Sequence, residues 1–299
     1  MTYIIENANV LDDQAITTTH FLIKQNKIAS RPASVNKLTH IRMDAKSFIM
    51  TPTSVMFNQQ VPEDMPFHQL KQYYLDSFIK KGCTTLLTTA QIQLESEFLL
   101  KIKQKRSQLI TSPIDYIIGV KIPVQLLTPS FIRKCKKEKI PVVFVEIDDL
   151  SELSSIPWGW VREAMFPYNA PLVPIFGNGS SKELIKSTDL WRKITVQEKI
   201  PSLQNELTES IPIAKQDLAK IGIYPLKSNL LHGGELSYNM YLMGNESRQV
   251  EEMSLFHYHN HRLVLTMHKG KMIRVGDKTS FCSGFGEQVM INKPSFYSF

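Results

Sequence analysis

Residues 141–147, Pro-Val-Val-Phe-Val-Glu-Ile, form an apolar run of strand length near the middle of the chain. A run with apolar residues at successive positions is typical of a strand that is buried on both faces, as in a parallel sheet. On both sides of it, helix-length and strand-length segments alternate. Helices are expected at residues 67–80, 94–104 and 128–137, and further strands at residues 84–89, 114–120 and 172–176. This alternation indicates βα units around a parallel sheet.

The two ends of the chain follow a different pattern. Short apolar runs separated by turn residues fill residues 3–50 and return after residue 224. Strands are expected there at residues 236–243, 259–268 and 271–274. Because both ends are rich in short strands, we expect them to pair with each other, with the βα segment inserted between them.

The composition excludes several classes of protein. The chain has 299 residues, of which 42% are hydrophobic, so it can form a core and is not expected to be disordered. No apolar stretch approaches the roughly 18 residues of a membrane-spanning helix. No basic region precedes an apolar run at the N-terminus, so no signal peptide is expected. The three cysteines show no paired spacing, which predicts reduced thiols in a cytoplasmic protein.

The net charge of +7 is concentrated in two basic runs, at residues 101–106 and 133–139. Such runs can grip phosphates in a nucleic acid or another polyanion. They are also typical of the exposed ends of amphipathic helices, where Lys and Arg suit the helix dipole. Neither run contains the aromatic residues of a platform for single-stranded nucleic acid, so we favour the second interpretation.

Several short motifs resemble, in their order along the chain, the cyclic amidohydrolases, the group of dihydroorotase, hydantoinase and dihydropyrimidinase. They are Ile-Lys-Gln-Asn-Lys-Ile-Ala at 23–29, Asp-Ala-Lys-Ser at 44–47, Thr-Pro-Thr at 51–53, Gly-Cys-Thr-Thr at 82–85, Asp-Leu-Ala-Lys-Ile-Gly-Ile-Tyr-Pro-Leu-Lys at 217–227, Leu-His-Gly-Gly-Glu-Leu-Ser at 231–237 and Thr-Met-His-Lys-Gly-Lys-Met-Ile at 266–273. The resemblance implies an α/β fold, with a TIM-like (β/α) barrel inserted into a small composite β-sandwich. The expected domains are residues 1–51 with 221–299 for the sandwich and 52–220 for the barrel.

The barrel segment is shorter than the resemblance requires. It holds 220 − 52 + 1 = 169 residues, whereas a complete (β/α)₈ barrel takes about 250 and roughly 200 at least. About three βα units are therefore expected to be missing, which leaves a shortened, incomplete barrel.

The resemblance also implies a metal centre, but the ligand positions differ. The His-x-His that ends the first barrel strand falls on Asn58 and Gln60, and the aspartate before it falls on Met56. The family's bridging lysine falls near Glu146 or Ile147. A lone carboxylate without histidine neighbours is more typical of a buried ion pair or a helix cap. Amide oxygens are poor substitutes for imidazole. We therefore expect no catalytic residue, no bound metal and no other cofactor, and treat Asn58, Gln60 and Glu146 as degenerate ligand positions.

His257, His259 and His261 are an alternative zinc site. Alternation in a strand would place the three imidazoles on one face. Cys282 and His268 could supplement them. In the other interpretation, these residues form a polar face of the terminal β-domain.

Two further segments stand out. Trp158 and Trp160 could form a stacking platform for a ring, or a plug that fills the space left by the missing barrel units. Residues 177–181, Gly-Asn-Gly-Ser-Ser, lack the ending of a phosphate-binding P-loop and indicate a flexible connection.

Three functions remain open at this point. The favoured one is an amidohydrolase-like protein that has lost metal-dependent C–N hydrolysis and acts in binding or assembly. The alternatives are a divergent metal-dependent hydrolase of cyclic amides and a polyanion or nucleic-acid binder. An unclosed sheet has two exposed edges and an apolar face that something must cover. Residues 157–160 and the helical stretch around residues 190–207 could cover them from within the chain. The other candidate is a second copy, so we expect a homodimer or a protein partner, with no membrane association.

Overall fold

The computed structural model describes residues 1–12, 15–62, 65–177, 181–244 and 251–295. The chain forms two compact units. Unit 1 comprises Met1–Met56, Asp64–Thr85 and Leu226–Ser283, and unit 2 comprises Phe57–Glu63, Leu86–Pro225 and Gly284–Phe299. The predicted division at residues 52 and 220 stays a prediction.

The described part of unit 1 is built on one mixed, mostly antiparallel sheet of nine strands. The strands are β1 (Thr2–Asp12), β2 (Ala15–Lys24), β3 (Lys27–Ser30), β4 (Ile41–Asp44), β5 (Phe48–Pro52), β11 (Tyr238–Leu242), β12 (Leu263–His268), β13 (Lys271–Val275) and β14 (Lys278–Thr279). Their order is β14-β13-β12-β11-β5-β1-β2-β3, and β4 pairs with β1. β5 and β11 run antiparallel, with Phe48 opposite Leu242 and Pro52 opposite Tyr238. Strands from both ends of the chain therefore share one sheet, and not the two facing sheets of the predicted sandwich.

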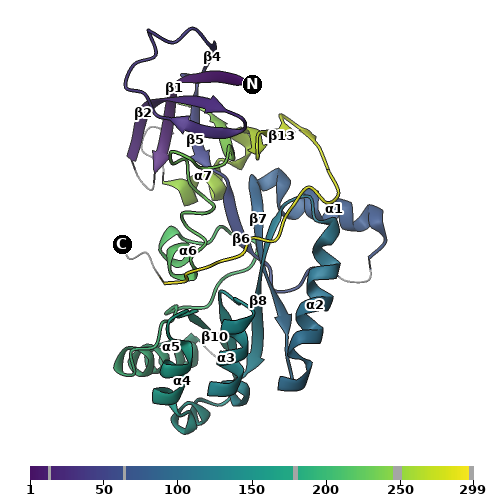
Figure 1. Cartoon of the computed structure of the whole chain (residues 1–299), viewed down its shortest axis with the longest axis vertical. Helices are drawn as coiled ribbons and strands as arrows, with labels where there is room; N and C mark the ends of the chain where they lie inside the picture. Colours follow the sequence, from purple (N-terminus) through teal and green to yellow (C-terminus); the bar gives the residue numbers. More distant parts are fainter. Residues whose placement is uncertain (13–14, 63–64, 178–180, 245–250, 296–299) are drawn as a thin grey trace. The chain divides into compact units, whose positions relative to one another are not determined.

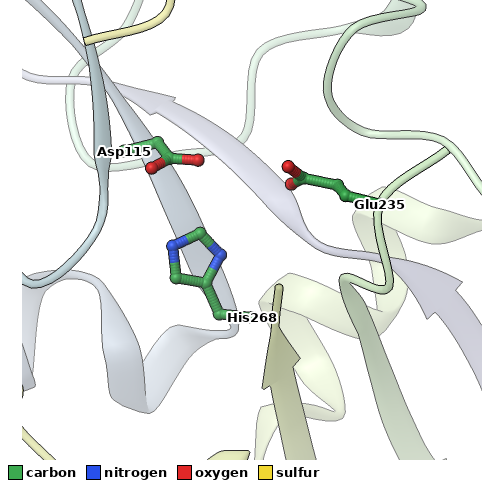
Figure 2. A group of neighbouring side chains, drawn as sticks. All are labelled: Asp115, Glu235 and His268. Atoms are coloured by element: carbon green, nitrogen blue, oxygen red, sulfur yellow. The ribbon is translucent and has the colours of Figure 1, made fainter. Parts of the chain in front are cut away.

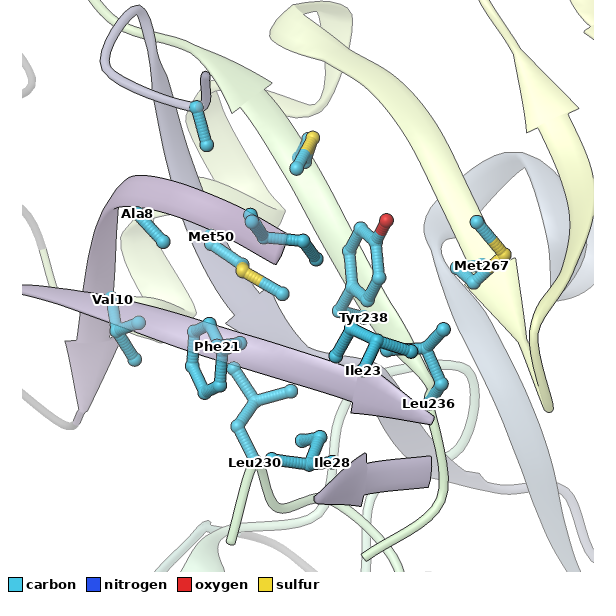
Figure 3. Close-up of a cluster of buried hydrophobic side chains, with 13 residues drawn as sticks. Ala8, Val10, Phe21, Ile23, Ile28, Met50, Leu230, Leu236, Tyr238 and Met267 are labelled. Atoms are coloured by element: carbon cyan, nitrogen blue, oxygen red, sulfur yellow. The ribbon is translucent and has the colours of Figure 1, made fainter. Parts of the chain in front are cut away.

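The core of unit 1 also draws on both ends of the chain. In Figure 3, Phe21 and Ile23 of β2 and Tyr238 of β11 point into a common apolar cluster, which also contains Ile28. Leu265 packs against this cluster, whereas Ile49 and Leu263 belong to a second one. Each fully buried aliphatic side chain stabilises the fold by about 1.5–3 kcal/mol. The helices α1 (Phe67–Ser77) and α7 (Glu252–Tyr258) and two 3₁₀ turns, Ile79–Lys81 and Asn260–Arg262, also belong to this unit.

The second sheet is parallel and has five strands within the described residues. They are β6 (Ser54–Phe57), β7 (Cys83–Gln91), β8 (Asp115–Pro123), β9 (Val143–Ile147) and β10 (Leu172–Phe176), in the order β10-β9-β8-β7-β6. The boundary between the units passes through β6 and β7. Residues 143–145 of β9 are buried, which confirms the strand predicted from the apolar run.

Helices follow the strands of unit 2, as the alternation predicted. They are α2 (Phe98–Gln108), α3 (Pro129–Lys137), α4 (Trp158–Met165), α5 (Ser181–Gln197) and α6 (Lys215–Ile221), whose colours run from blue for α2 through teal to green for α6 in Figure 1. The start of α3 illustrates the local cause: the Thr128 hydroxyl accepts the Phe131 N–H at 3.2 Å, and Pro129 occupies the first turn. The described sheet has three strands fewer than the eight of a complete barrel, so it is a half-barrel.

Residues 201–210, which we call the strap, contact both edges of this half-barrel. At the β10 edge, the Leu172 N–H donates to the Pro201 carbonyl at 2.9 Å and the Leu203 N–H donates to the Leu172 carbonyl at 2.8 Å. At the β6 edge, the Ser210 N–H donates to the Phe57 carbonyl at 2.9 Å. The strap thus supplies hydrogen-bond partners to backbone groups of β10 and β6, the two outer strands of the sheet.

Residues 284–295, which we call the tail, run along unit 2. The Gly286 N–H donates to the Ser112 carbonyl at 2.9 Å, and the Glu287 N–H donates to the buried Asp115 carboxylate at 2.8 Å. Farther along, the Tyr168 hydroxyl donates to the Ile291 carbonyl at 2.9 Å. Among the described residues, no helix combines the length and apolarity needed to cross a membrane.

Candidate functional site

Polar side chains gather where the parallel strands of unit 2 end. Asn58 follows β6, Thr88 and Thr89 lie near the end of β7, Lys121 near the end of β8 and Glu146 near the end of β9. The carboxyl ends of parallel strands share one edge of a sheet, which is where α/β proteins commonly bind their ligands. We therefore treat this edge as the candidate site.

The segment after β6 is fixed by hydrogen bonds inside unit 2. Asn58 is 8% exposed. Its backbone N–H donates to the Leu87 carbonyl at 2.9 Å, and its side-chain Oδ1 accepts the Ser210 hydroxyl at 3.2 Å. The Gln59 carbonyl accepts the Thr88 and Thr89 hydroxyls at 3.1 and 3.0 Å. Gln60 is exposed. The structure thus buries Asn58 against the strap and does not bring Gln60 into the same environment.

Lys121 and Glu146 form an ion pair between neighbouring strands. Their strands run parallel, with Lys121 opposite Phe144, and Lys121 Nζ lies 2.5 Å from Glu146 Oε1. The side chains are 10% and 26% exposed. Charges this close and partly shielded from water attract each other more strongly than an exposed pair. The interpretation of Glu146 as an ion-pair partner is confirmed.

The strap brings two carboxylates to the carboxyl ends of the strands. Glu209 Oε1 accepts the Gln59 N–H at 2.8 Å, and Glu206 Oε1 accepts the Phe176 N–H at 2.5 Å. The two bonds hold the strap to opposite ends of the row of strands, at β6 and at β10. Sequence reasoning did not identify Glu206, Glu209 or Ser210, because no local pattern marks them.

The residues present do not fit the metal centre that the family resemblance implies. Asn58 offers an amide oxygen that already accepts a hydrogen bond, Gln60 lies on the surface, and the Glu146 carboxylate is neutralised by Lys121. A transition metal such as zinc prefers imidazole, thiolate or unpaired carboxylate ligands. Within the described residues, the three positions on which the family's ligands fall therefore do not supply the donor set for such an ion.

The fold, unlike the sequence, has clear relatives. No protein-family model and no curated protein matches the sequence. Among solved structures, the chain is similar to a dihydropyrimidinase from Brevibacillus agri NCHU1002, with a TM-score of 0.63, 10% identity and 100% of each chain covered. It is also similar to a D-hydantoinase, with a TM-score of 0.61 and 11% identity over 98% of this chain and 99% of the other. The chain has a hydantoinase-like fold.

A third similar structure supports this assignment of the hydantoinase-like fold. It is an L-hydantoinase (dihydropyrimidinase) from Arthrobacter aurescens, with a TM-score of 0.57 and 13% identity over 97% of this chain and 100% of the other. The resemblance derived from the sequence motifs is thus confirmed at the level of the fold.

His257, His259 and His261 do not lie on one face of a strand, so that prediction was wrong. His257 lies in the last turn of α7, His259 caps this helix, and His261 lies in the following 3₁₀ turn, Asn260–Arg262. The physical reason is that residues 252–258 form a helix whose Leu255 is buried in the second apolar cluster of unit 1. The His259 and His261 rings lie 6.1 Å apart.

His268 lies in a different part of unit 1, near Glu235. The Glu235 carboxylate pairs with Lys227 Nζ at 2.5 Å and accepts the Ser237 hydroxyl at 2.9 Å. An imidazole nitrogen of the buried His268 lies within 4.8 Å of a Glu235 oxygen (Figure 2). Figure 2 also shows Asp115, which belongs to unit 2, where it holds the tail. The sequence did not predict the ion pair between Glu235 and Lys227. Both residues were noted only as members of the motifs at residues 217–227 and 231–237, and nothing in those motifs indicates that they contact each other.

The two tryptophans do not form a shared stacking platform. Trp158 is buried, donates its indole N–H to the Leu153 carbonyl at 2.9 Å and packs edge-on against Trp191 of α5. Trp160 is 64% exposed. Of the segment 177–181, residues 178–180 lie outside the described residues.

The basic runs take part in contacts within unit 2. Lys134 pairs with Glu95 at 2.9 Å and Arg106 pairs with Glu138 at 3.6 Å. The Lys136 ammonium donates to the Phe166 carbonyl at 2.8 Å. These contacts agree with the interpretation of the runs as helix ends.

Proposed function

We propose that this hydantoinase-like chain does not catalyse metal-dependent C–N hydrolysis and acts as a binding or assembly protein. The observation that carries the proposal is the state of the ligand positions at the strand ends: Asn58 is bonded to the strap and Glu146 to Lys121. Both side chains are committed to contacts inside the chain.

Electrostatics supports the same conclusion. The Lys121 ammonium puts a positive charge beside the carboxylate nearest to the expected bridging position. A divalent ion placed there would be repelled by this charge, and displacing the lysine would leave a partly buried charge without its partner. A hydrolase needs such an ion to activate water and polarise the amide.

The test is metal loading followed by an activity assay. The purified protein is incubated with Zn²⁺, Mn²⁺ or Co²⁺, desalted and measured for bound metal, and then assayed with hydantoin, dihydrouracil and dihydroorotate. We expect no stoichiometric metal and no turnover. About one or two ions per chain that are lost in Asn58→Ala, or turnover that needs the metal and is lost in Glu146→Gln, would overturn the proposal in favour of a divergent hydrolase.

The homodimer stays a prediction within this proposed role. The strap supplies backbone partners to Leu172 at one edge of the half-barrel and to Phe57 at the other, which weakens the argument from open edges for a second copy. Sedimentation at micromolar concentration decides between a dimer and a monomer. A monomer would direct the search toward a different protein partner or a small ligand.

A further inference from the structure

The sheet of unit 1 leaves part of β2 with a neighbouring strand on one side only. β1 pairs with β2 from Ala15 to Lys24. On the opposite side of β2, β3 pairs only with Leu22, Ile23 and Lys24. Within the described residues, no other strand, isolated bridge or loop backbone pairs with residues 15–20 on that side. Because a strand directs alternate N–H and C=O groups to each side, this segment, which we call the open edge, presents backbone donors and acceptors to any strand that reaches it.

Other outer strands of the molecule are covered by backbone from elsewhere in the chain. Along β3, the Ile28 N–H donates to the Gly234 carbonyl at 3.0 Å, and the Gly233 N–H donates to the Ile28 carbonyl at 2.8 Å. In unit 2, the strap bonds to Leu172 of β10 and to Phe57 of β6. The open edge differs from these edges, because no described segment covers it in the same way.

The composition of the open edge favours pairing with another strand. Its sequence, Ala-Ile-Thr-Thr-Thr-His at residues 15–20, contains no Lys, Arg, Asp, Glu or Pro. Charged side chains and proline are the usual devices that keep an edge strand from pairing with another chain. Isoleucine and threonine are β-branched and suit an extended strand. Ala15, Thr17 and Thr18 are exposed, so a second strand can approach.

The open edge is held in its extended form by the rest of unit 1. Ile16 packs against the second apolar cluster, and Phe21, directly after the open edge, is buried in the first. The Thr18 hydroxyl donates to Asn9 Oδ1 of β1 at 2.9 Å. A strand that is already ordered loses little conformational entropy when a partner pairs with it.

We infer that the open edge pairs with the same edge of a second copy, as two antiparallel strands related by a two-fold axis. In this arrangement each strand supplies the partners of the other, which is the closed symmetry that most homodimers have. Two-fold pairing places similar or identical residues opposite one another, so a charged residue near the centre would meet its own charge. The open edge has no Lys, Arg, Asp or Glu, and threonine opposite threonine is a favourable cross-strand pair.

This interface names the partner for the assembly role proposed above, and it rests on that role. Its test does not involve metal or turnover, so the two proposals can fail separately. A contact limited to one strand from each chain is at the small end of protein interfaces, so we expect a dimer that dissociates on dilution.

The test is analytical ultracentrifugation of the full chain over micromolar to millimolar concentrations. One variant carries Thr17→Lys with Thr19→Lys, and a second carries Thr17→Glu with Thr19→Glu. The matched control carries Ser34→Lys with Thr39→Lys, which adds the same charge at two exposed residues between β3 and β4. Circular dichroism checks that each variant is folded.

We expect a concentration-dependent dimer of the unchanged chain. The Kd should rise about tenfold or more in the lysine variant and in the glutamate variant, because like charges then meet across the axis, and should not change in the control. An equal mixture of the lysine and glutamate variants should associate again, since opposite charges then face each other.

Amide hydrogen exchange of the unchanged chain is a second measurement that needs no variant. Alternate amides of residues 15–20 should exchange more slowly at high protein concentration, whereas the amides that bond to β1 should not change. A monomer at every concentration, a dimer that both charged variants leave intact, or exchange at the open edge that does not depend on concentration would overturn the inference.

Discussion

Lys121 of β8 and Glu146 of β9 form a diagonal ion pair across adjacent parallel strands, two residues out of register, with 2.5 Å between Nζ and Oε1. The pair occupies the strand edge at which a relative of this fold would be expected to hold its reacting groups. Since the lysine is the more buried partner, the carboxylate is the main compensation for its charge.

Removing one member of this pair should lower the free energy of unfolding more than removing both members. Glu146→Gln leaves the Lys121 charge without its partner, and we expect a loss of about 1.5–3 kcal/mol in the free energy of unfolding. Replacing the pair together, by Lys121→Met and Glu146→Leu, should recover most of that loss. Urea denaturation measures all three proteins. The control is Lys134→Gln at the more exposed pair with Glu95, where about 0.2–1 kcal/mol is expected. A double variant as unstable as Glu146→Gln would contradict this account.

The two carboxylates of the strap should protect two different amides from hydrogen exchange. Glu209→Ala removes the acceptor of the Gln59 N–H, so that amide should exchange faster, whereas the Phe176 N–H should not change. Glu206→Ala should have the reverse effect. Each variant is the other's control, measured by amide exchange with NMR detection. If either variant accelerates both amides equally, the strap is not held at two separate points.

Cys282 should be the first thiol to react in the folded protein. The hydrogen bond with Lys271 lowers the pKa of Cys282, whereas burial raises the pKa of Cys83 to about 12 and raises that of Cys135 as well. Since the thiolate is the nucleophile, iodoacetamide at neutral pH should label Cys282 and leave the other two until the chain unfolds. Peptide mass mapping gives the three rates. Lys271→Met should slow the labelling of Cys282; an unchanged rate would exclude this role for the lysine.

Asp217 should oppose folding at neutral pH. Burial raises its pKa above the ordinary value of 3.8, so the native state binds the proton more tightly than the unfolded chain does. The cost is present above the raised pKa and disappears below pH 3.8. Asp217→Asn should therefore raise the Tm at pH 7 but not at pH 3.

Asp149→Asn is the control for this effect. Hydrogen bonds from Ser151 lower the pKa of Asp149, so its substitution should lower the Tm at pH 7, with the difference fading in acid. Thermal melts from pH 3 to 8 test both variants. A gain for Asp217→Asn that persists at pH 3 would point to a cause other than ionisation.

Local patterns in the sequence predicted the βα part of the fold well. The run at residues 141–147 is apolar at nearly every position, and Thr128-Pro129 carries its own helix-start signal, so neither needs distant residues to be recognised. Residues 257–261 misled the prediction, because alternating histidines look like a polar strand face. A helix forms there because Leu255 is buried in a cluster with residues more than 200 positions away, such as Leu11 and Ile49.

The candidate site was only partly predictable for the same reason. Glu146 was interpreted as an ion-pair or helix-cap partner, and the identity of its partner, Lys121, depends on the register between β8 and β9. Asn58 and Ser210 are 152 positions apart, and Gln59 and Glu209 are 150 apart. The sequence indicated that the stretch around residues 190–207 could cover the open sheet, but no single-sequence pattern links residues at such separations, so the contacts of the strap are found only in three dimensions.

The tail affects how the chain can fold during its synthesis on the ribosome. Unit 1 needs strands β11 to β14 for its sheet, and the described part of unit 2 receives bonds from residues 284–295. Neither unit can form all of its contacts until these segments have been synthesised. The strands of the half-barrel are synthesised before the tail residues that bond to them. A nascent chain stalled before residue 284 lacks the contacts of the tail. It should therefore be cleaved by a protease faster than the full-length chain.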